Sequence, residues 1–192
     1  MLSEFETSLA DVAQNEYDRY HGYDENDPIL ASRIKVYWTS VKDAFPGVSM
    51  AWSAVFVSWC LKSAGATKSE FRFSKRHSEF VFWAIQNAEA GFGLFRGYPI
   101  MECAPSVGDI VHLNRPNKSL TFQYAATHEK YESHSAIVVA TGHDSSGRFA
   151  LTIGGNEDFP GSVRRRKIPV DEDGLIIQNP AKPFISVIQT LK

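Results

Sequence analysis

Three polar residues far apart in the sequence have the side-chain types that hydrolysis of an amide or ester requires. Such hydrolysis uses a nucleophile, a base that takes the proton of the nucleophile, and a group that orients the base. Ser53 lies at the start of a long apolar segment, and His134 and Asn156 lie at the ends of two later ones. The hydroxyl, the imidazole and the amide are therefore the candidate nucleophile, base and orienting group.

The segment that carries Ser53 predicts a buried helix. Residues 50–66, MAWSAVFVSWCLKSAGA, are apolar almost all round, repeat their large side chains at helical spacing, and include Gly65 as a stop. Ser53 is expected in the first turn, where backbone N–H groups and the helix dipole stabilise developing negative charge. The alternative is that Ser53 is an ordinary polar residue of a first turn, where serine is common.

His134 and Asn156 fall at the ends of two predicted strands. His134 begins HSAIVVA and shares a face with Ala136, while Asn156 follows the Gly154-Gly155 pair. If the small residues of both strands pack on the buried helix, the imidazole and the amide come together beside Ser53. The alternatives are a strand-end histidine bonded to the backbone and a turn asparagine with no further role.

Trp52 and His77 are the candidate substrate-binding residues. Trp52 precedes Ser53, and His77 lies near the start of another predicted helix, so both could line a cleft beside the hydroxyl. The alternative for each is the core. Aromatic residues at helical spacing usually pack there, and His77 is in register with the apolar Val81 and so faces inward.

The sequence predicts neither a metal site nor a cofactor. The two cysteines are too few for a disulfide framework and are not at ligand spacing. His112, His128 and His143 have no cysteine or carboxylate partners at ligand spacing. Cys60 lies about 10 Å along the helix from Ser53, because it is seven residues further on, and it is expected in the core.

The elements around these residues predict a single α+β domain. Helical periodicity comes first, near residues 2–17, 29–41, 50–66 and 74–91, and short β-branched segments follow near 107–113, 133–142, 148–155 and 163–170. This order favours helices packed on an antiparallel sheet. We divide the domain, 1–192, into an N-terminal helical layer, 1–45, and a core, 46–192. The long connection at 114–133 is typical of a functional or mobile loop.

Composition excludes several classes of protein. The 192 residues carry 20 Lys+Arg and 22 Asp+Glu, a net charge of −2, so nothing favours nucleic acid or an anionic membrane as a partner. The N-terminal segment lacks the basic start and apolar run of a signal peptide, and no stretch reaches the ~18 apolar residues that span a bilayer. We expect synthesis in the cytoplasm and, for action elsewhere, delivery by a phage or secretion machine. The oligomeric state stays open.

Taken together, these segments resemble the CHAP and NlpC-like branch of the papain-fold amidases and peptidases. The resemblance covers most of the chain and includes the early Tyr37-Trp38. It rests on AWSAVFVSWCLKSAGA at 51–66, HSEF at 77–80, VGDIVHL at 107–113, HSAIVVA at 134–140 and IGGNEDFPGSV at 153–163. Within that branch, the chain is similar to a family of bacterial and phage proteins with a domain of uncharacterised function.

The resemblance implies a papain-like core and a cell-wall substrate. Members of the superfamily typically cleave peptidoglycan at peptide or N-acetylmuramoyl-alanine amide bonds, with a cysteine at a helix start, a histidine at a strand start and a polar third residue. Ser53 stands where that cysteine belongs, and His134 and Asn156 match the other two. The expected function is a peptidoglycan amidase or peptidase. The runner-up is an inactive module that binds cell-wall peptide or serves as a structural part of a phage or secretion system.

A serine in place of the cysteine changes the chemistry. A thiol can rest as a thiolate beside an imidazolium, whereas a hydroxyl cannot, so His134 has to be neutral and take the proton during attack. The backbone N–H of Ser53 is the expected donor to the oxyanion. A natural nucleophile, an engineered cysteine replacement and a disarmed site all remain open for Ser53, and so does the identity of the bond.

Overall fold

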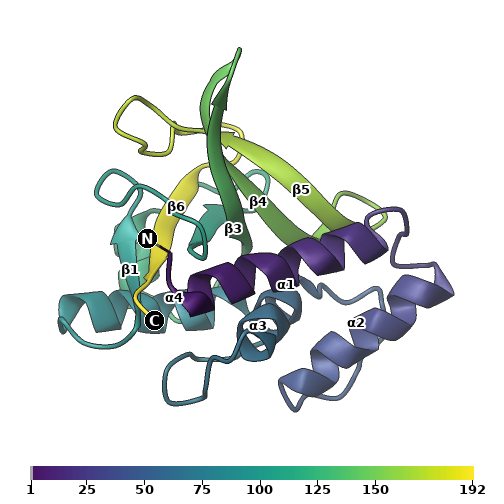
Figure 1. The fold of residues 1–192 in the computed structure, drawn as a ribbon. Helices are drawn as coiled ribbons and strands as arrows, with labels where there is room; N and C mark the ends of the chain where they lie inside the picture. The colour runs from purple at the N-terminus through teal and green to yellow at the C-terminus, as the bar shows by residue number, and fades with distance from the viewer. Residues whose placement is uncertain (1) are drawn as a thin grey trace.

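The chain folds into helices on a six-stranded antiparallel sheet, an α+β architecture as the order of segments predicted (Figure 1). The structure is a computed structural model and describes residues 2–192. Its elements are α1 (Glu4–Tyr20), α2 (Pro28–Ser40), α3 (Ser53–Ser63), α4 (His77–Glu89), β1 (Phe95–Pro99), β2 (Ile110–Asn114), α5 (Phe122–Thr127), β3 (Ser133–Asp144), β4 (Gly147–Glu157), β5 (Ser162–Pro169) and β6 (Phe184–Thr190). Within residues 2–192, no helix combines the length and the apolar character that crossing a membrane takes.

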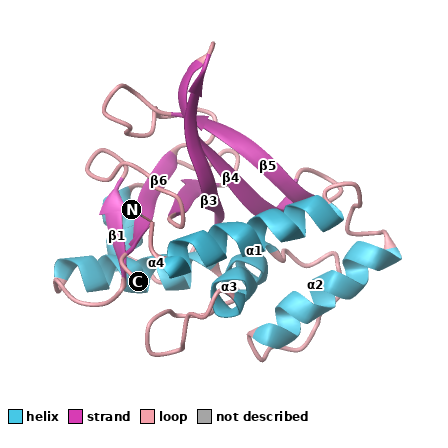
Figure 2. Cartoon of the chain, viewed as in Figure 1, coloured by secondary structure: helices cyan, strands magenta, loops and turns pink. Residues whose placement is uncertain are grey.

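The sheet has the strand order β1-β6-β2-β3-β4-β5, and every neighbouring pair is antiparallel. Figure 2 shows α1, α2 and α3 gathered beneath the long strands β3, β4 and β5. Strands β1 and β6 were not predicted from the sequence, and neither was the short helix α5, which lies in the connection 114–133 that was expected to be a loop. In β1, a Cβ at Gly97 would lie 2.9 Å from the backbone nitrogen of Ile85, so the glycine lets this edge strand approach α4 closely.

Two apolar clusters hold the two faces of the sheet. The larger joins side chains of the first four helices, from Phe5 in α1 to Ile85 in α4, with Ile137 and Ile153 of the sheet. The smaller lies on the opposite face and includes Val138. Because α1 and α2 contribute to the larger cluster, the N-terminal helical layer and the rest of the chain share one core.

The face that packs on α3 differs from the one predicted. Ile137 and Ile153 belong to the cluster that contains α3. Val138 and Ala150, which strand alternation places on the predicted faces of His134 and Asn156, belong to the cluster on the other side. The physical reason is volume, since branched aliphatic side chains fill the space between sheet and helix. At Gly155 the sheet does approach α3 closely, because a Cβ there would lie 2.5 Å from the Trp52 ring and 2.7 Å from that of Phe56.

The helix starts follow local rules except at α3. Ser3 and Glu6 form a capping box at α1, and Asp27 caps α2 ahead of Pro28. Trp52 occupies the cap position of α3, and no side chain of residues 2–192 caps that helix. The first N–H groups of α3 are therefore available to a ligand or a developing charge.

Candidate active site

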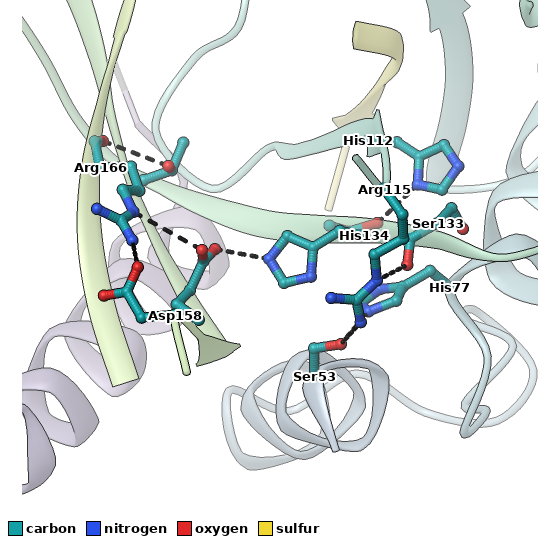
Figure 3. Close-up of polar contacts among 11 residues, drawn as sticks. Ser53, His77, His112, Arg115, Ser133, His134, Asp158 and Arg166 are labelled. Carbon is teal, nitrogen blue, oxygen red and sulfur yellow. Dashed lines mark hydrogen bonds and ion pairs between the residues drawn. The ribbon is translucent and has the colours of Figure 1, made fainter. Parts of the chain in front are cut away.

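The candidate site lies where two helices begin and two strands end. Ser53 is the first residue of α3 and His77 is the first residue of α4. His134 is the second residue of β3, and Glu157 is the last residue of β4. Figure 3 shows the first three of these side chains together, with Arg115 among them.

The hydroxyl of Ser53 makes a hydrogen bond to the imidazole of His77, and not to that of His134, the predicted base. Ser53 Oγ lies 2.7 Å from His77 Nε2, and Arg115 Nη2 donates to the same oxygen at 3.3 Å. Ser53 is only 1% exposed, although it lines a groove. The nucleophile candidate is thus held between a histidine and an arginine at the bottom of that groove.

His77 is neutral at ordinary pH. Burial holds the pKa of His77 well below its usual range, and the neighbouring His134, His112 and Arg115 disfavour a further positive charge there. A neutral ring can accept the hydroxyl proton of Ser53 at Nε2 while the hydroxyl oxygen accepts from Arg115. Nδ1 of His77 is buried without a partner in residues 2–192, so nothing there stabilises a protonated ring.

His134 is paired with a carboxylate. Its Nε2 lies 2.6 Å from Glu157 Oε1, and both side chains are about nine-tenths buried. Burial raises the pKa of Glu157, but His134, Arg166 and Lys182 outweigh it and bring that pKa down to about 2. Arg166 Nε lies 3.7 Å from the second oxygen of Glu157. The carboxylate is therefore ionised.

The ionised carboxylate fixes the orientation of the His134 ring. A carboxylate only accepts hydrogen bonds, so Nε2 of His134 carries the hydrogen, and the lone pair of the neutral ring is on Nδ1. Nδ1 is buried and has no hydrogen-bond partner within the described chain. In Figure 3 this nitrogen is directed toward the side of Ser53 and Arg115. The rings of His134 and His77 are 5.3 Å apart and meet edge to face.

Within the described residues, Asn156 makes no hydrogen bond to His134. Its Nδ2 donates to Glu25 Oε2 at 3.0 Å, and its φ of 56° is left-handed. The pairing of β4 with β5 shifts between Gly154 and Glu157, which marks a bulge. The extra residue reverses the alternation of side chains after Gly154, so Glu157 takes the place predicted for Asn156. Glu157, rather than Asn156, therefore occupies the position beside His134 that was predicted for the orienting residue.

The two predicted substrate-binding residues have different surroundings. Trp52 is fully buried, and its Nε1 donates to Glu25 Oε2 at 3.0 Å. It therefore holds Glu25, which lines the groove beside Ser53. His77 lines the groove beside Ser53. The substrate-binding roles of both remain predictions.

The groove above Ser53 is large enough for a short peptide. Its volume is about 1060 Å³. Its wall combines positive and negative side chains with Phe159, a residue that is 94% exposed. The residues that line it include Glu25, Ser53, Arg115, Lys130, Glu132 and Phe159.

The other candidate ligands are engaged elsewhere. Within residues 2–192, no group of three His, Cys, Asp or Glu side chains is arranged to hold a metal ion. His112 bonds Ser135 Oγ at 2.8 Å and Tyr131 Oη at 3.1 Å, and burial lowers its pKa to about 3. Cys60 is fully buried in the core, as predicted.

Sequence reasoning missed two residues of this site. Glu157 follows a Gly-Gly pair inside a strand, and such a pair is itself a signal of a bulge. Arg115 directly follows β2, and the sequence gives it no periodic or motif signal. Both are charged side chains that only the three-dimensional arrangement brings to the hydroxyl and the imidazole.

The comparisons with known proteins identify a family and go no further. A family model described as "Uncharacterized protein conserved in bacteria (DUF2272)" matches residues 21–186, which is most of the chain. Neither a curated protein nor a solved structure matches the sequence.

Proposed function

We propose that this chain, which belongs to that uncharacterised bacterial family, hydrolyses an amide bond in the peptide part of peptidoglycan. The proposal includes a papain-like core of the CHAP and NlpC type. Its supports are the order of the site-bearing elements, with the nucleophile candidate at the start of a buried helix and the imidazole at the start of a later strand. The sequence resemblance contributes the choice of substrate.

The observation that carries the proposal is the pairing of His134 with Glu157. An ionised carboxylate holds Nε2, and Nδ1 is left without a hydrogen-bond partner within the described residues, on the side of the ring that Figure 3 shows directed toward Ser53. A nucleophile, a base and an orienting carboxylate are the three parts of a hydrolytic triad. A buried, unused acceptor nitrogen is costly for a fold, so a role in taking a proton explains its presence.

In the proposed mechanism, Ser53 Oγ attacks the carbonyl carbon while its proton moves to His134 Nδ1. The oxyanion is stabilised by the N–H groups at the uncapped start of α3. His134 then gives the proton to the leaving amine, and the substrate acyl group remains as an ester on Ser53. Water, activated by the same imidazole, hydrolyses that ester and restores the hydroxyl.

His134 is a better base than His77 even though His77 is the one in contact with Ser53. The burial and positive neighbours that lower the pKa of His77 also oppose its protonation during attack. Glu157 stabilises the positive ring of His134 in the same step. The mechanism therefore requires that the Ser53 hydroxyl turns away from His77 and toward His134 before attack.

Digestion of purified peptidoglycan tests the proposal. The wild-type protein is expected to release peptide-containing fragments that mass spectrometry identifies, and Ser53→Ala and His134→Ala are expected to lower the rate by about 10²–10⁴. His77→Gln, which keeps a hydrogen-bond partner for Ser53, is expected to lose far less. Full activity of Ser53→Ala, or a greater loss in His77→Gln than in His134→Ala, would contradict the mechanism.

One observation favours a second candidate, a binding module without catalysis. Ser53 is nearly inaccessible and its oxygen is already held by Arg115. In that case the groove binds cell-wall peptide and the triad is a relic. Activity that appears only in Ser53→Cys supports a disarmed site, and binding of peptide with no hydrolysis by any variant supports the module.

A further inference from the structure

We propose that Arg115 is a carboxylate-binding residue, and that the substrate carries a free carboxylate next to the amide bond that Ser53 attacks. This inference deepens the proposed function and rests on it for the location of the reacting bond. It assigns to the groove a charge preference that determines which peptides enter.

The side chain of Arg115 is fixed in place beside the nucleophile. Its Nε donates to the carbonyl oxygen of Ser133 at 3.2 Å, and its Nη2 donates to Ser53 Oγ at 3.3 Å. A guanidinium has five N–H donors, so most of them remain for a ligand. Arg115 also lines the groove, so these donors are accessible to a peptide bound there.

Arg115 lacks the ion pair that a half-buried guanidinium normally has. The two carboxylates that act on its charge are Glu157 and Glu132. Glu157 is paired with His134 and Arg166, and Glu132 pairs with Lys118 at 3.8 Å. Within residues 2–192, Arg115 therefore forms no ion pair with either of them or with any other carboxylate. An unpaired, desolvated charge is unfavourable for stability, and a substrate anion supplies the missing partner.

The surrounding charges favour a carboxylate over a phosphate. Glu25, Glu132 and Asp158 also line the groove, and they would repel a dianion more strongly than a single negative charge. The planar fork of a guanidinium also matches a carboxylate with two parallel hydrogen bonds.

Binding of a carboxylate would also release the nucleophile. When a carboxylate oxygen accepts from the same Nη2 N–H that bonds Ser53 Oγ, that N–H no longer holds the hydroxyl. The hydroxyl is then free to turn toward Nδ1 of His134. A peptide with the right charge would thus both occupy the groove and prepare the serine for attack.

Three synthetic peptides test the inference. The probe is the stem tetrapeptide Ala-γ-Glu-Lys-Ala with both carboxylates free, and its two analogues have either the glutamate α-carboxylate or the C-terminal carboxylate as an amide. Binding is measured by calorimetry in the Ser53→Ala background, where no hydrolysis occurs. We expect one of the two amidations to weaken binding by about tenfold or more, as loss of a hydrogen bond between charged groups does.

Variants of Arg115 assign that preference to the guanidinium. In Arg115→Gln the ratio between the free and amidated peptides is expected to fall to about one, and Arg115→Lys is expected to keep part of it because the charge remains. Lys130→Gln is the matched control, since it removes an exposed positive charge from the same groove. Thermal unfolding of each variant establishes that it is folded.

The results separate this inference from the proposed function. Equal binding of all three peptides, no binding of any of them, or a preference that persists in Arg115→Gln overturns the role of Arg115. Hydrolysis of free and amidated peptides at equal rates by the wild type leaves the hydrolase in place and removes the carboxylate. A preference that depends on Arg115 without hydrolysis by the wild type keeps the carboxylate site and removes the hydrolase.

Discussion

Replacement of Glu157 by glutamine separates charge from shape at the centre of the site. Glutamine has nearly the same volume as glutamate and still accepts a hydrogen bond from His134 Nε2. It does not carry the negative charge that faces His134 at 2.6 Å and Arg166 at 3.7 Å. Glu157→Gln is therefore equivalent to a permanently protonated glutamate.

The size of the effect follows from the pKa of Glu157. That pKa is about 2 in the folded protein against an ordinary value of 4.5, because His134 and the nearby cations outweigh the effect of burial. The difference corresponds to about 3 kcal/mol of unfolding free energy at neutral pH. Because the folded pKa is lowered, this stabilisation is present above pH 4.5 and is lost as the pH falls toward 2.

Urea unfolding at a series of pH values measures this contribution. Glu157→Gln is expected to be less stable than wild type by about 3 kcal/mol at pH 7, and the difference is expected to shrink below pH 4.5. Glu132→Gln is the control, because it removes an exposed carboxylate from the same groove. It is expected to change stability by less than about 0.5 kcal/mol. A deficit for Glu157→Gln that is the same at pH 3 and pH 7 would refute the ionised pair.

Three further predictions test the fold and the groove. His112→Asn is expected to be less stable than wild type at pH 7. Because the folded pKa of His112 is about 3, urea unfolding should show this deficit shrink by up to about 1.4 kcal/mol per pH unit below pH 6.5. A deficit that does not change with pH would contradict the neutral state of His112. Gly155→Ala is expected to lower the unfolding free energy by about 1–3 kcal/mol, because the added Cβ would overlap the Trp52 ring. Gly22→Ala is the control, because a Cβ at Gly22 would have open space around it. Equal losses of unfolding free energy in the two variants would refute the close packing at Gly155. Phe159→Ala is expected to leave the melting temperature unchanged and to weaken peptide binding several-fold in calorimetry, and unchanged affinity would remove the exposed ring from the binding surface.

Much of the architecture follows from periodicity in the sequence. The first four helices and strands β2 to β5 have the periods of 3.6 and 2 that identify them, and the buried helix α3 is apolar on all sides. Strands β1 and β6 were missed. They pair with each other although they lie far apart in the sequence. In β1, Gly97 interrupts the strand pattern, and it is needed there because the backbone packs closely on α4.

The site was predictable to the level of element ends and no further. Ser53 and His134 do lie at the start of a helix and of a strand. The partner of the imidazole depends on a bulge that shifts the alternation by one residue, which exchanges Asn156 for Glu157. A strict period of two contains no information about such a shift, although the Gly-Gly pair hints at it.

The contact between Ser53 and His77 shows a second limit of the sequence. The two residues begin different helices, and their 2.7 Å contact depends on how α3 and α4 approach each other. Packing against the shared core sets that approach, and no local pattern encodes it. The sequence favours either core or cleft for His77, and in the structure this residue is both buried and at the groove wall.

Labelling with a fluorophosphonate tests most directly whether Ser53 is an activated nucleophile, because the reagent needs no knowledge of the substrate. Intact-protein and peptide mass spectrometry should find one phosphonyl group per chain, on Ser53, in the wild-type protein. The labelling rate should fall at least about 10²-fold in His134→Ala and much less in His77→Gln. Absence of the adduct on Ser53, or labelling at the same rate in folded His134→Ala, would contradict the serine hydrolase.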